Sequence, residues 1–335
     1  MKPLQIVSQP DDLDQGLFGQ VFYYLLQVLP YLHRHGIYPA WDVRAKHYGE
    51  LPDCRTVPGA LDLAYDPPRG PYRTIHLFEL RRRHAHILGN DWVALNRLWC
   101  SYFKVPQRIL LRADKAQPKG RILGIHYRGT DKQTAAWDSN PISQDQYIAL
   151  IQDFLEHRPE FDGIVAASDE SSFIEKFSAS IPLPTVSLGE VEFHMATEQK
   201  ISRTEKTDRA VLDCVLFSRC DCLIETSSAL PSFAKLLNPN LEVYRCAASK
   251  LFGKLYTNTP YFPVAHIPHL PVANPASLDI LRSTMEQDWT YEPHTAKYRD
   301  PFVSLPRWPI NNTLYTVAEK LRVDKLVARV LSGHY

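Results

Sequence analysis

The chain has 335 residues, of which 44% are hydrophobic and 22% are charged. This length and hydrophobic content allow a sizeable buried core and exceed what one typical domain needs. Lysine plus arginine (38) nearly cancels aspartate plus glutamate (37), which argues against nucleic acid or an anionic membrane as the main partner. A phosphate-binding site would therefore have to be built locally.

Two features bear on the cellular compartment. No stretch approaches the roughly 20 apolar residues of a transmembrane helix, and the N-terminal residues lack the pattern of a secretion signal. The six cysteines show neither a paired framework nor the spacing of a zinc site. We therefore expect a cytoplasmic protein with reduced thiols and no transmembrane segment.

The first part of the chain predicts a strand, a polar loop and a long helix. A short apolar run from Leu4 to Val7 suits a strand, and residues 17–35 form an apolar-rich helical pattern that ends at Gly36. Residues 40–71 are rich in proline, glycine and aspartate, which predicts irregular structure.

Three further features precede residue 120. The basic run at residues 81–83 predicts a solvent-exposed helix face. A helix is expected around residues 92–103, and residues 113–120 are typical of a linker.

From residue 121 onward, short apolar runs alternate with helical patterns. The expected strands cover residues 121–127, 163–167, 184–188, 222–225 and 241–245. The expected helices follow Ser143 as a candidate N-cap, contain Phe173 and Phe177, and cover residues 208–219 and 228–237. This alternation predicts an α/β fold with a parallel, doubly wound sheet.

Three polar clusters fall where strands of this sheet end. They are HYRGTDK after the first strand, SDESS after the second and ETSS after the fourth. In parallel sheets, ligands bind outside the carboxyl ends of the strands, where the next helices begin. The sequence therefore predicts a binding site at this edge of the sheet.

Arg128 is the residue in these clusters that best suits a diphosphate. Its planar guanidinium stays charged and can bind phosphate oxygens through two hydrogen bonds. Lys132 could add a second charge, and Ser227 and Ser228 could offer hydroxyls and N–H groups at a helix start. Asp131 is expected to orient Arg128 or a loop amide.

Several of these residues also have a structural interpretation. HYRGTDK could be a strand-end loop with an internal salt bridge, His126 could be a core histidine, and Asp169 and Glu170 could cap the next helix. Asp213 lies among apolar neighbours in AVLDCVLF, which is unusual for a carboxylate that neither has a partner nor holds a ligand. The alternative is a partly exposed helix edge.

The segment IHYRGTDK resembles the HxRRTDK-type signature of the GDP-fucose-dependent alpha-1,6-fucosyltransferases, which include rhizobial nodulation enzymes and the animal enzyme that modifies the N-glycan core. VAASDESSFI is similar to the ATDD segment of that family, and AVLDCVLFSRCDCLIETSSALPSFA is similar to its final donor-site motif. DQGLFGQVF loosely resembles the Gly-x-Gly-Asn-Gln opening of related fucosyltransferases. The main similarity covers residues 124–239.

The resemblance implies a two-lobed fold of the GT-B type, with a Rossmann-like second lobe that binds the donor. It implies an inverting, metal-independent transfer of fucose from GDP-fucose to a glycan or glycolipid, without a cofactor, in carbohydrate biosynthesis. We expect an N-terminal α/β lobe on the acceptor side at residues 1–115 and a donor-binding lobe at 118–246. A C-terminal extension at 247–335 would pack its final helix, 313–331, back on the lobes.

The resemblance also implies roles for individual residues. Arg128 would stabilise the leaving diphosphate, and His126 and Asp131 would support its loop. Asp169 and Glu170 would lie near the ribose or guanine. The full substrate-binding set comprises His126, Asp131, Lys132, Asp169, Glu170, Asp213, Ser227, Ser228, Gly16 and Gly19. The two glycines would let the chain approach a ligand, or only permit a turn.

The chain departs from the family pattern at three places, one of which is Ala229 after the Ser pair, where the core-type enzyme has a polar side chain. Gly129 stands where the family has a second arginine, so a donor contact is lost or is supplied by Lys132 or Arg209. The family's glutamate after the signature lysine has no clean match. Asp138 is the nearest carboxylate, and we hypothesise that it is the base that takes the proton of the acceptor.

Other interpretations remain open at the level of sequence. Asp12 and Asp14 resemble a metal-binding DxD, but their place before the first helix favours helix capping. The alternatives for the whole chain are a non-catalytic nucleotide- or glycan-binding relative and a transferase that uses another GDP-sugar.

Overall fold

The computed structural model describes residues 2–8, 13, 16–50, 55–84, 91–129, 143–187, 202–226 and 228–245. The strands are β1 (Leu4–Val7), β2 (Ala40–Arg44), β3 (Arg55–Val57), β4 (Asp62–Leu63), β5 (Arg73–His76), β6 (Phe103–Lys104), β7 (Ile122–Tyr127), β8 (Gly163–Ser168), β9 (Thr185–Val186), β10 (Cys222–Glu225) and β11 (Glu242–Arg245). The helices are the π-helix η2 (Leu17–Phe22) and the α-helices α1 (Tyr23–Arg34), α2 (Leu77–His84), α3 (Trp92–Cys100), α4 (Gln107–Ala116), α5 (Gln144–His157), α6 (Ser171–Ser180), α7 (Arg203–Ser218) and α8 (Leu230–Leu237). The C-terminal extension, with its expected helix at residues 313–331, lies outside the described residues.

The second half of the described chain forms the predicted parallel sheet. Its strand order is β11-β10-β7-β8-β9, and every neighbouring pair is parallel. All residues of the central strand β7 are buried, which explains its nearly continuous apolar sequence. The α/β fold with a parallel sheet is confirmed, although β9 is shorter than expected.

The sequence predicted the start of α5 correctly and placed the start of α7 too far along the chain. Ser143 caps α5: its hydroxyl accepts a hydrogen bond from Gln146 N at 3.2 Å, and Gln146 Oε1 accepts one from Ser143 N. The helix expected at residues 208–219 begins five residues earlier, at Arg203, behind the N-cap Ser202. Its first turn is polar and charged, so it lacks the apolar periodicity on which the prediction rested.

The first sheet of the chain lies near the N-terminus, with the order β3-β2-β1-β5, and the five-stranded parallel sheet is the second sheet. Strands β2 and β5 both pair in parallel with β1, and β3 pairs antiparallel with β2. The irregular structure predicted for residues 40–71 is therefore wrong in part, because this segment contains β2, β3 and β4. Short strands held by remote partners leave little trace in local composition.

The linker expected at residues 113–120 is also wrong in its first half, which belongs to α4. This helix buries only Ile109 and Ala113 and otherwise contacts α7 through charges. Arg108 donates hydrogen bonds to both carboxylate oxygens of Asp208, at 2.9 and 2.8 Å. Arg112 pairs with Glu205 at 3.0 Å. The helix therefore carries little hydrophobic signal in its sequence.

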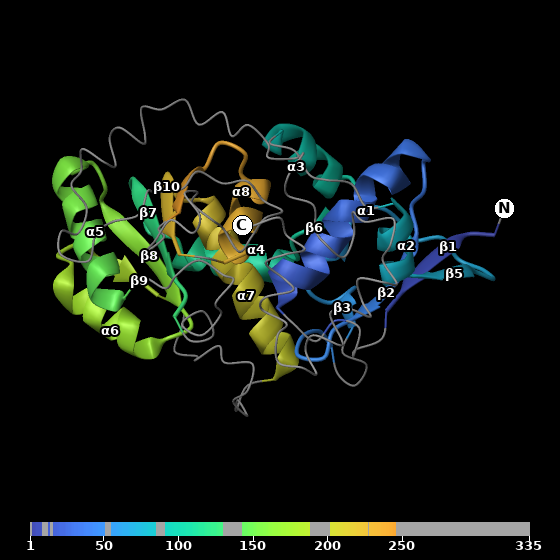
Figure 1. The fold of residues 1–335 in the computed structure, drawn as a ribbon, viewed down its shortest axis with the longest axis horizontal. Helices are drawn as coiled ribbons and strands as arrows, with labels where there is room; N and C mark the ends of the chain where they lie inside the picture. The colour runs from blue at the N-terminus through green and yellow to red at the C-terminus, as the bar shows by residue number, and fades with distance from the viewer. Residues whose placement is uncertain are drawn as a thin grey trace, which may run out of the picture.

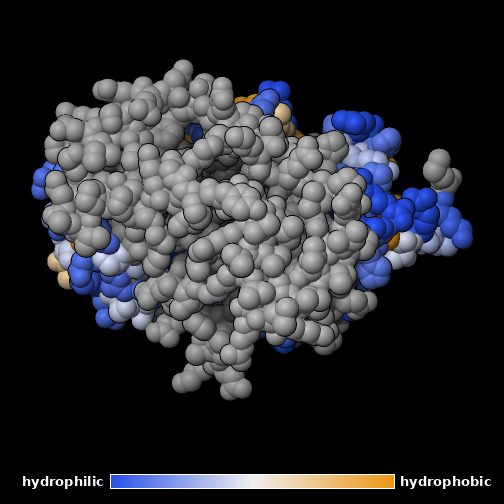
Figure 2. Space-filling view, viewed as in Figure 1, coloured by the Kyte–Doolittle hydropathy of each residue, from blue (hydrophilic) through white to orange (hydrophobic). Residues whose placement is uncertain are grey.

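Helix α2 contains the basic run, and here one residue departs from the prediction. Arg81 is buried rather than solvent-exposed: its guanidinium lies 3.7 Å from the centre of the Tyr24 ring and donates to Gln27 Oε1 at 2.6 Å. Arg82 and Arg83 do face outward and pair with Glu79. Figure 2 shows hydrophilic side chains over this end of the molecule, around α2.

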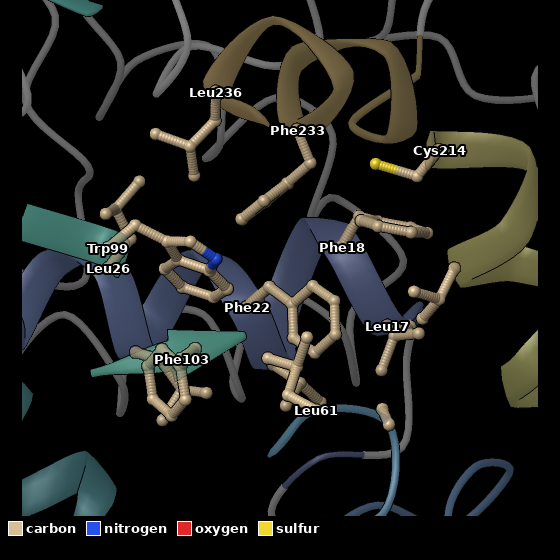
Figure 3. Packing of buried hydrophobic residues seen from close by; sticks show 14 of the residues in the cluster. Leu17, Phe18, Phe22, Leu26, Leu61, Trp99, Phe103, Cys214, Phe233 and Leu236 are labelled. Carbon is tan, nitrogen blue, oxygen red and sulfur yellow. The ribbon is translucent and has the colours of Figure 1, made fainter. Parts of the chain in front are cut away.

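The helices between the two sheets share one hydrophobic core. Figure 1 shows the sheets toward opposite ends, with α1, α4, α7 and α8 between them. Buried side chains of η2, α1 and α3 pack in a single cluster with those of α7 and α8. In Figure 3, Phe233 of α8 points among Trp99, Phe22 and Phe18. Helices α5 and α6 cover the other face of the second sheet with a separate cluster. The division into lobes at residues 115–118 stays a prediction.

Candidate functional site

Three polar segments meet at the carboxyl edge of the second sheet, as the sequence predicts. Strand β7 lies between β10 and β8, so the residues that follow these strands are neighbours. Arg128 N donates to Thr226 Oγ1 at 2.7 Å, and Gly129 N donates to Asp169 Oδ1 at 2.9 Å. These bonds fix the backbone after β7 between the two flanking strand ends.

The guanidinium of Arg128 lies beside a buried carboxylate and is itself partly exposed. Its Nε lies 3.9 Å from Asp169 Oδ2, and the Arg128 side chain keeps 29% of its surface exposed while Asp169 keeps 5%. Asp169 thus orients Arg128, whereas Asp131, for which a similar role is expected, lies outside the described residues. Such an arrangement can hold a cation in place and present it to an anionic ligand.

His126 lies at the end of β7, buried under the Arg128 loop. Its ring meets that of Phe217 edge-on, with 6.0 Å between the ring centres. Burial, together with the positive charge of Arg128, lowers the pKa of His126 to about 3. Its Nδ1 has no hydrogen-bond partner among the described residues. His126 is therefore neutral at physiological pH, which excludes it as a phosphate-binding cation.

Asp213 lies on α7, one turn closer to the carboxyl edge than Phe217, because α7 runs antiparallel to the strands and the two residues are four apart. Its side chain is half-buried at the surface, yet dense packing around the carboxyl group raises its pKa to about 7. Arg209 and Arg112 oppose this shift. Asp213 makes no hydrogen bond or ion pair with the described residues, so its carboxyl group is available to a ligand.

The raised pKa of Asp213 predicts a pH-dependent stability that Asp213→Asn should remove. The pKa of this carboxyl group is about 7 in the folded chain and close to the ordinary aspartate value of 3.8 in the unfolded chain. The group therefore binds its proton more tightly in the folded state. Its contribution is thus fully present below about pH 4 and is lost as the pH rises through about 7. The stability of the native chain relative to Asp213→Asn should fall over this window by at most about 1.4 kcal/mol per pH unit.

Urea unfolding of both proteins, from about pH 5 to about pH 8, measures this difference. A difference in free energy of unfolding that stays constant across this range would contradict the assigned pKa.

Glu170 lies directly beside the backbone that follows Arg128. A Cβ atom added at Gly129 would come within 2.5 Å of Glu170 Cδ and closer still to Oε1. Gln144, in the first turn of α5, donates to Glu170 Oε2 at 2.6 Å. Position 129 therefore requires glycine, because the carboxylate of Glu170 occupies the space that a side chain there would need.

The hydroxyl group of Tyr147 connects the ends of β7 and β10. This hydroxyl lies 2.7 Å from the carbonyl oxygen of Ile224 and 3.2 Å from that of His126. The phenol ring is fully buried among the aromatic side chains of α5, β7 and α6. This buried bridge keeps β10 and β7 in register next to Arg128.

The N-terminal helix reaches the same edge of the second sheet. A Cβ added at Gly19 would lie 3.6 Å from Cβ of Ala229, directly before α8, whereas one added at Gly16 would meet nothing within 4 Å. Ser228 is buried, and its Oγ lies 3.4 Å from Leu230 N. The structure therefore brings Gly19 and Ser228 together, near the strand end that carries Thr226.

Several predicted site residues lie outside the described part of the chain, and their placement is not tested: Asp131, Lys132, Asp138 and Ser227, together with Asp12 and Asp14. Sequence reasoning missed Thr226, Gln144 and Tyr147. Thr226 stands inside the polar cluster ETSS and could have been found there. Gln144 and Tyr147 act across 26 and 77 residues of sequence, so no local signal marks them.

The described residues contain no group of three histidine, cysteine, aspartate or glutamate side chains arranged to hold a metal ion. No helix among them is both long enough and apolar enough to cross a membrane.

Comparison with known proteins gives structural neighbours only. No protein-family model and no curated protein matches the chain. Among solved structures it is similar to the fucosyltransferase NodZ from Bradyrhizobium, at 18% identity and a TM-score of 0.47, over 71% of this chain and 94% of that chain. It is also similar to FUT1 of Arabidopsis thaliana in complex with GDP, at 10% identity and a TM-score of 0.42, over 77% and 72% of the two chains. For POFUT1 in complex with GDP-fucose, the identity is 9% and the TM-score 0.40, over 70% and 92%. At such low values these neighbours assign no role to any residue here.

Proposed function

We propose that this chain is an inverting glycosyltransferase that moves fucose from GDP-fucose to a hydroxyl group of a glycan or glycolipid, without a metal. The observation that carries the proposal is the partly exposed guanidinium of Arg128 at the carboxyl end of the central strand, with the backbone of residues 128–129 fixed by Thr226 and Asp169. The resemblance of the segments around these residues to donor-site motifs of fucosyltransferases supports the choice of donor.

Transfer from a nucleotide diphosphate builds negative charge on the departing phosphate. A fixed cation aimed at that charge stabilises the transition state more than the ground state. Arg128 supplies this cation in the proposal, because its side chain is held by Asp169 and still reaches solvent. Lys132 is the proposed second cation.

The remaining donor contacts follow from the chemistry of the nucleoside. Guanine presents N–H donors, and an ionised carboxylate can accept two of them. Asp213, on the helix α7, offers a carboxyl group that is ionised above about pH 7. We assign Asp213, Ser227 and Ser228 to the nucleotide, with Asp169 near its ribose or guanine.

The acceptor side is proposed to be the N-terminal lobe, residues 1–115, and the donor side residues 118–246. The close approach of Gly19 to Ala229 supports a site at the junction of these parts, since it places the helix after β1 against the start of α8. The extension at residues 247–335 is proposed to pack back on both.

The test is GDP release from GDP-fucose by the purified protein in EDTA, with and without a panel of oligosaccharides. The proposal expects release that the right oligosaccharide accelerates, and no release from GDP-mannose. Release from GDP-mannose alone would replace fucose with another sugar. GDP binding without release from either donor would make the chain a non-catalytic binding protein, and would overturn the proposed reaction.

A further inference from the structure

The carboxyl edge of the second sheet carries several carboxylates, and their surroundings differ. Asp169 is buried and accepts from Gly129 N, so it holds the loop. Glu225, at the end of β10, is fully buried. Glu170 is half-buried, and Gln144 donates a hydrogen bond to its Oε2. The other oxygen, Oε1, lies against Gly129 and accepts no hydrogen bond from the described residues.

The position of Glu170 depends on the absence of a side chain at residue 129. The carboxylate fills the space that a Cβ at Gly129 would need. Gln144 Nε2, 2.6 Å from Oε2, limits the rotation of the carboxylate, and the same amide lies 3.3 Å from Ser172 Oγ. A half-buried carboxylate with one oxygen oriented by a donor, and with no hydrogen bond to the other, has the arrangement of a general base.

A role in donor binding fits Glu170 poorly. A diphosphate bound by Arg128 would lie close to a second negative charge, and like charges at short range repel. Asp169 already supplies the orienting contact to Arg128. A negative charge beside the reacting centre is useful only if it acts on a proton or on developing positive charge.

We infer that Glu170 is the catalytic base of the transfer, oriented by Gln144 in the space that Gly129 leaves open. This assignment rests on the proposed function and replaces Asp138 in that role. Glu170 Oε1 accepts the proton of the acceptor hydroxyl as the acceptor oxygen forms its bond to the anomeric carbon. The bond from that carbon to the phosphate oxygen breaks, its electron pair stays on GDP, and Arg128 compensates the charge. The half-exposed carboxyl group then returns its proton to water.

Glu170→Gln keeps the shape of the side chain and removes the base. The expected loss in kcat is about 100-fold or more, the usual size for a general base. The affinity for GDP, measured by titration calorimetry, should be unchanged or higher, because a negative charge near the diphosphate is gone. Glu175→Gln is the matched control, since Glu175 is exposed on α6, the helix that Glu170 precedes. It should leave both quantities unchanged.

Gln144 is a positioning residue in this account. Gln144→Ala should lower kcat by about tenfold, the effect of one lost hydrogen bond, at unchanged GDP affinity. Gly129→Ala should lower kcat as well, since it displaces the carboxylate. A role in stability alone would move the unfolding midpoint of these variants but not their kcat.

Turnover of GDP-fucose by Glu170→Gln at the wild-type rate would overturn the assignment, as would loss of its GDP binding in a folded protein. Asp138→Asn is measured beside it: normal activity there is expected, and a loss confined to Asp138→Asn would return the role to that residue. A wild-type protein that binds GDP but releases none from GDP-fucose overturns the proposed function, and the assignment with it. The two failures are therefore distinct.

Discussion

Replacing Arg128 with alanine should lower GDP release from GDP-fucose by about 100-fold or more, because a lost charge-stabilising donor at a reacting centre costs about 10² to 10³ in rate. The fold should survive, since the bond from Arg128 N to Thr226 Oγ1 does not involve the side chain. Arg128→Lys keeps the charge but loses the planar pair of donors, so its rate should lie between the two.

The control for Arg128→Ala is Arg121→Ala, one strand length earlier. Arg121 is more exposed, with 52% of its side chain in solvent, and pairs only loosely with Glu160 at 3.9 Å. Its replacement should change neither rate nor stability beyond experimental error. A folded Arg128→Ala protein that keeps the wild-type rate would show that the diphosphate binds elsewhere.

Replacing Phe233 with alanine should destabilise the protein by about 3 to 5 kcal/mol, the usual cost of emptying a buried aromatic site. Its ring centre lies 5.5 Å from those of Phe18, Phe22 and Trp99, and only 2% of the residue is exposed. Phe18 and Phe22 belong to η2, and Trp99 belongs to α3. The cavity would therefore open among the helices that lie between the two sheets (Figure 3).

Urea unfolding followed by far-ultraviolet circular dichroism measures the effect of Phe233→Ala. One shared core predicts that both sheets are lost in a single transition. Leu111→Ala is the control, since Leu111 is 59% exposed on α4 and should change the free energy of unfolding by no more than about 0.5 kcal/mol. A loss below about 1 kcal/mol for Phe233→Ala would contradict a shared core.

The parts of the fold that the sequence predicted are those with strong local patterns. Strand β7 is buried along its whole length, and its apolar run is visible without any partner. The cap Ser143 and the glycine after α1, Gly36 with a φ of 61°, mark helix ends through local backbone chemistry. These features need only neighbouring residues to be recognised.

The parts that were missed depend on remote partners. Strand β5 is largely exposed and joins the first sheet only by pairing with β1, far away in sequence. Arg81 reads as one of three surface arginines, and its burial depends on Tyr24 and Gln27 from another helix. Composition cannot show such contacts, because the same residues would face water without them.

The candidate site was likewise predicted only in part. Its location was predicted, since polar residues after strands of a parallel sheet gather at one edge. Its internal contacts were not: Arg128 meets Asp169, and the carboxylate of Glu170 occupies the space beside Gly129. From the sequence alone, Gly129 in place of an arginine indicates a lost donor contact, and only the structure shows the carboxylate beside it.

The central claim, that a nucleoside diphosphate binds at the carboxyl end of β7, is tested most directly by titration calorimetry of GDP in EDTA. The account predicts binding by the wild-type protein, and an affinity at least about tenfold lower for Arg128→Ala, the loss of one charge-assisted hydrogen bond or more. No binding by the wild type, or equal affinity of the two proteins, would contradict it.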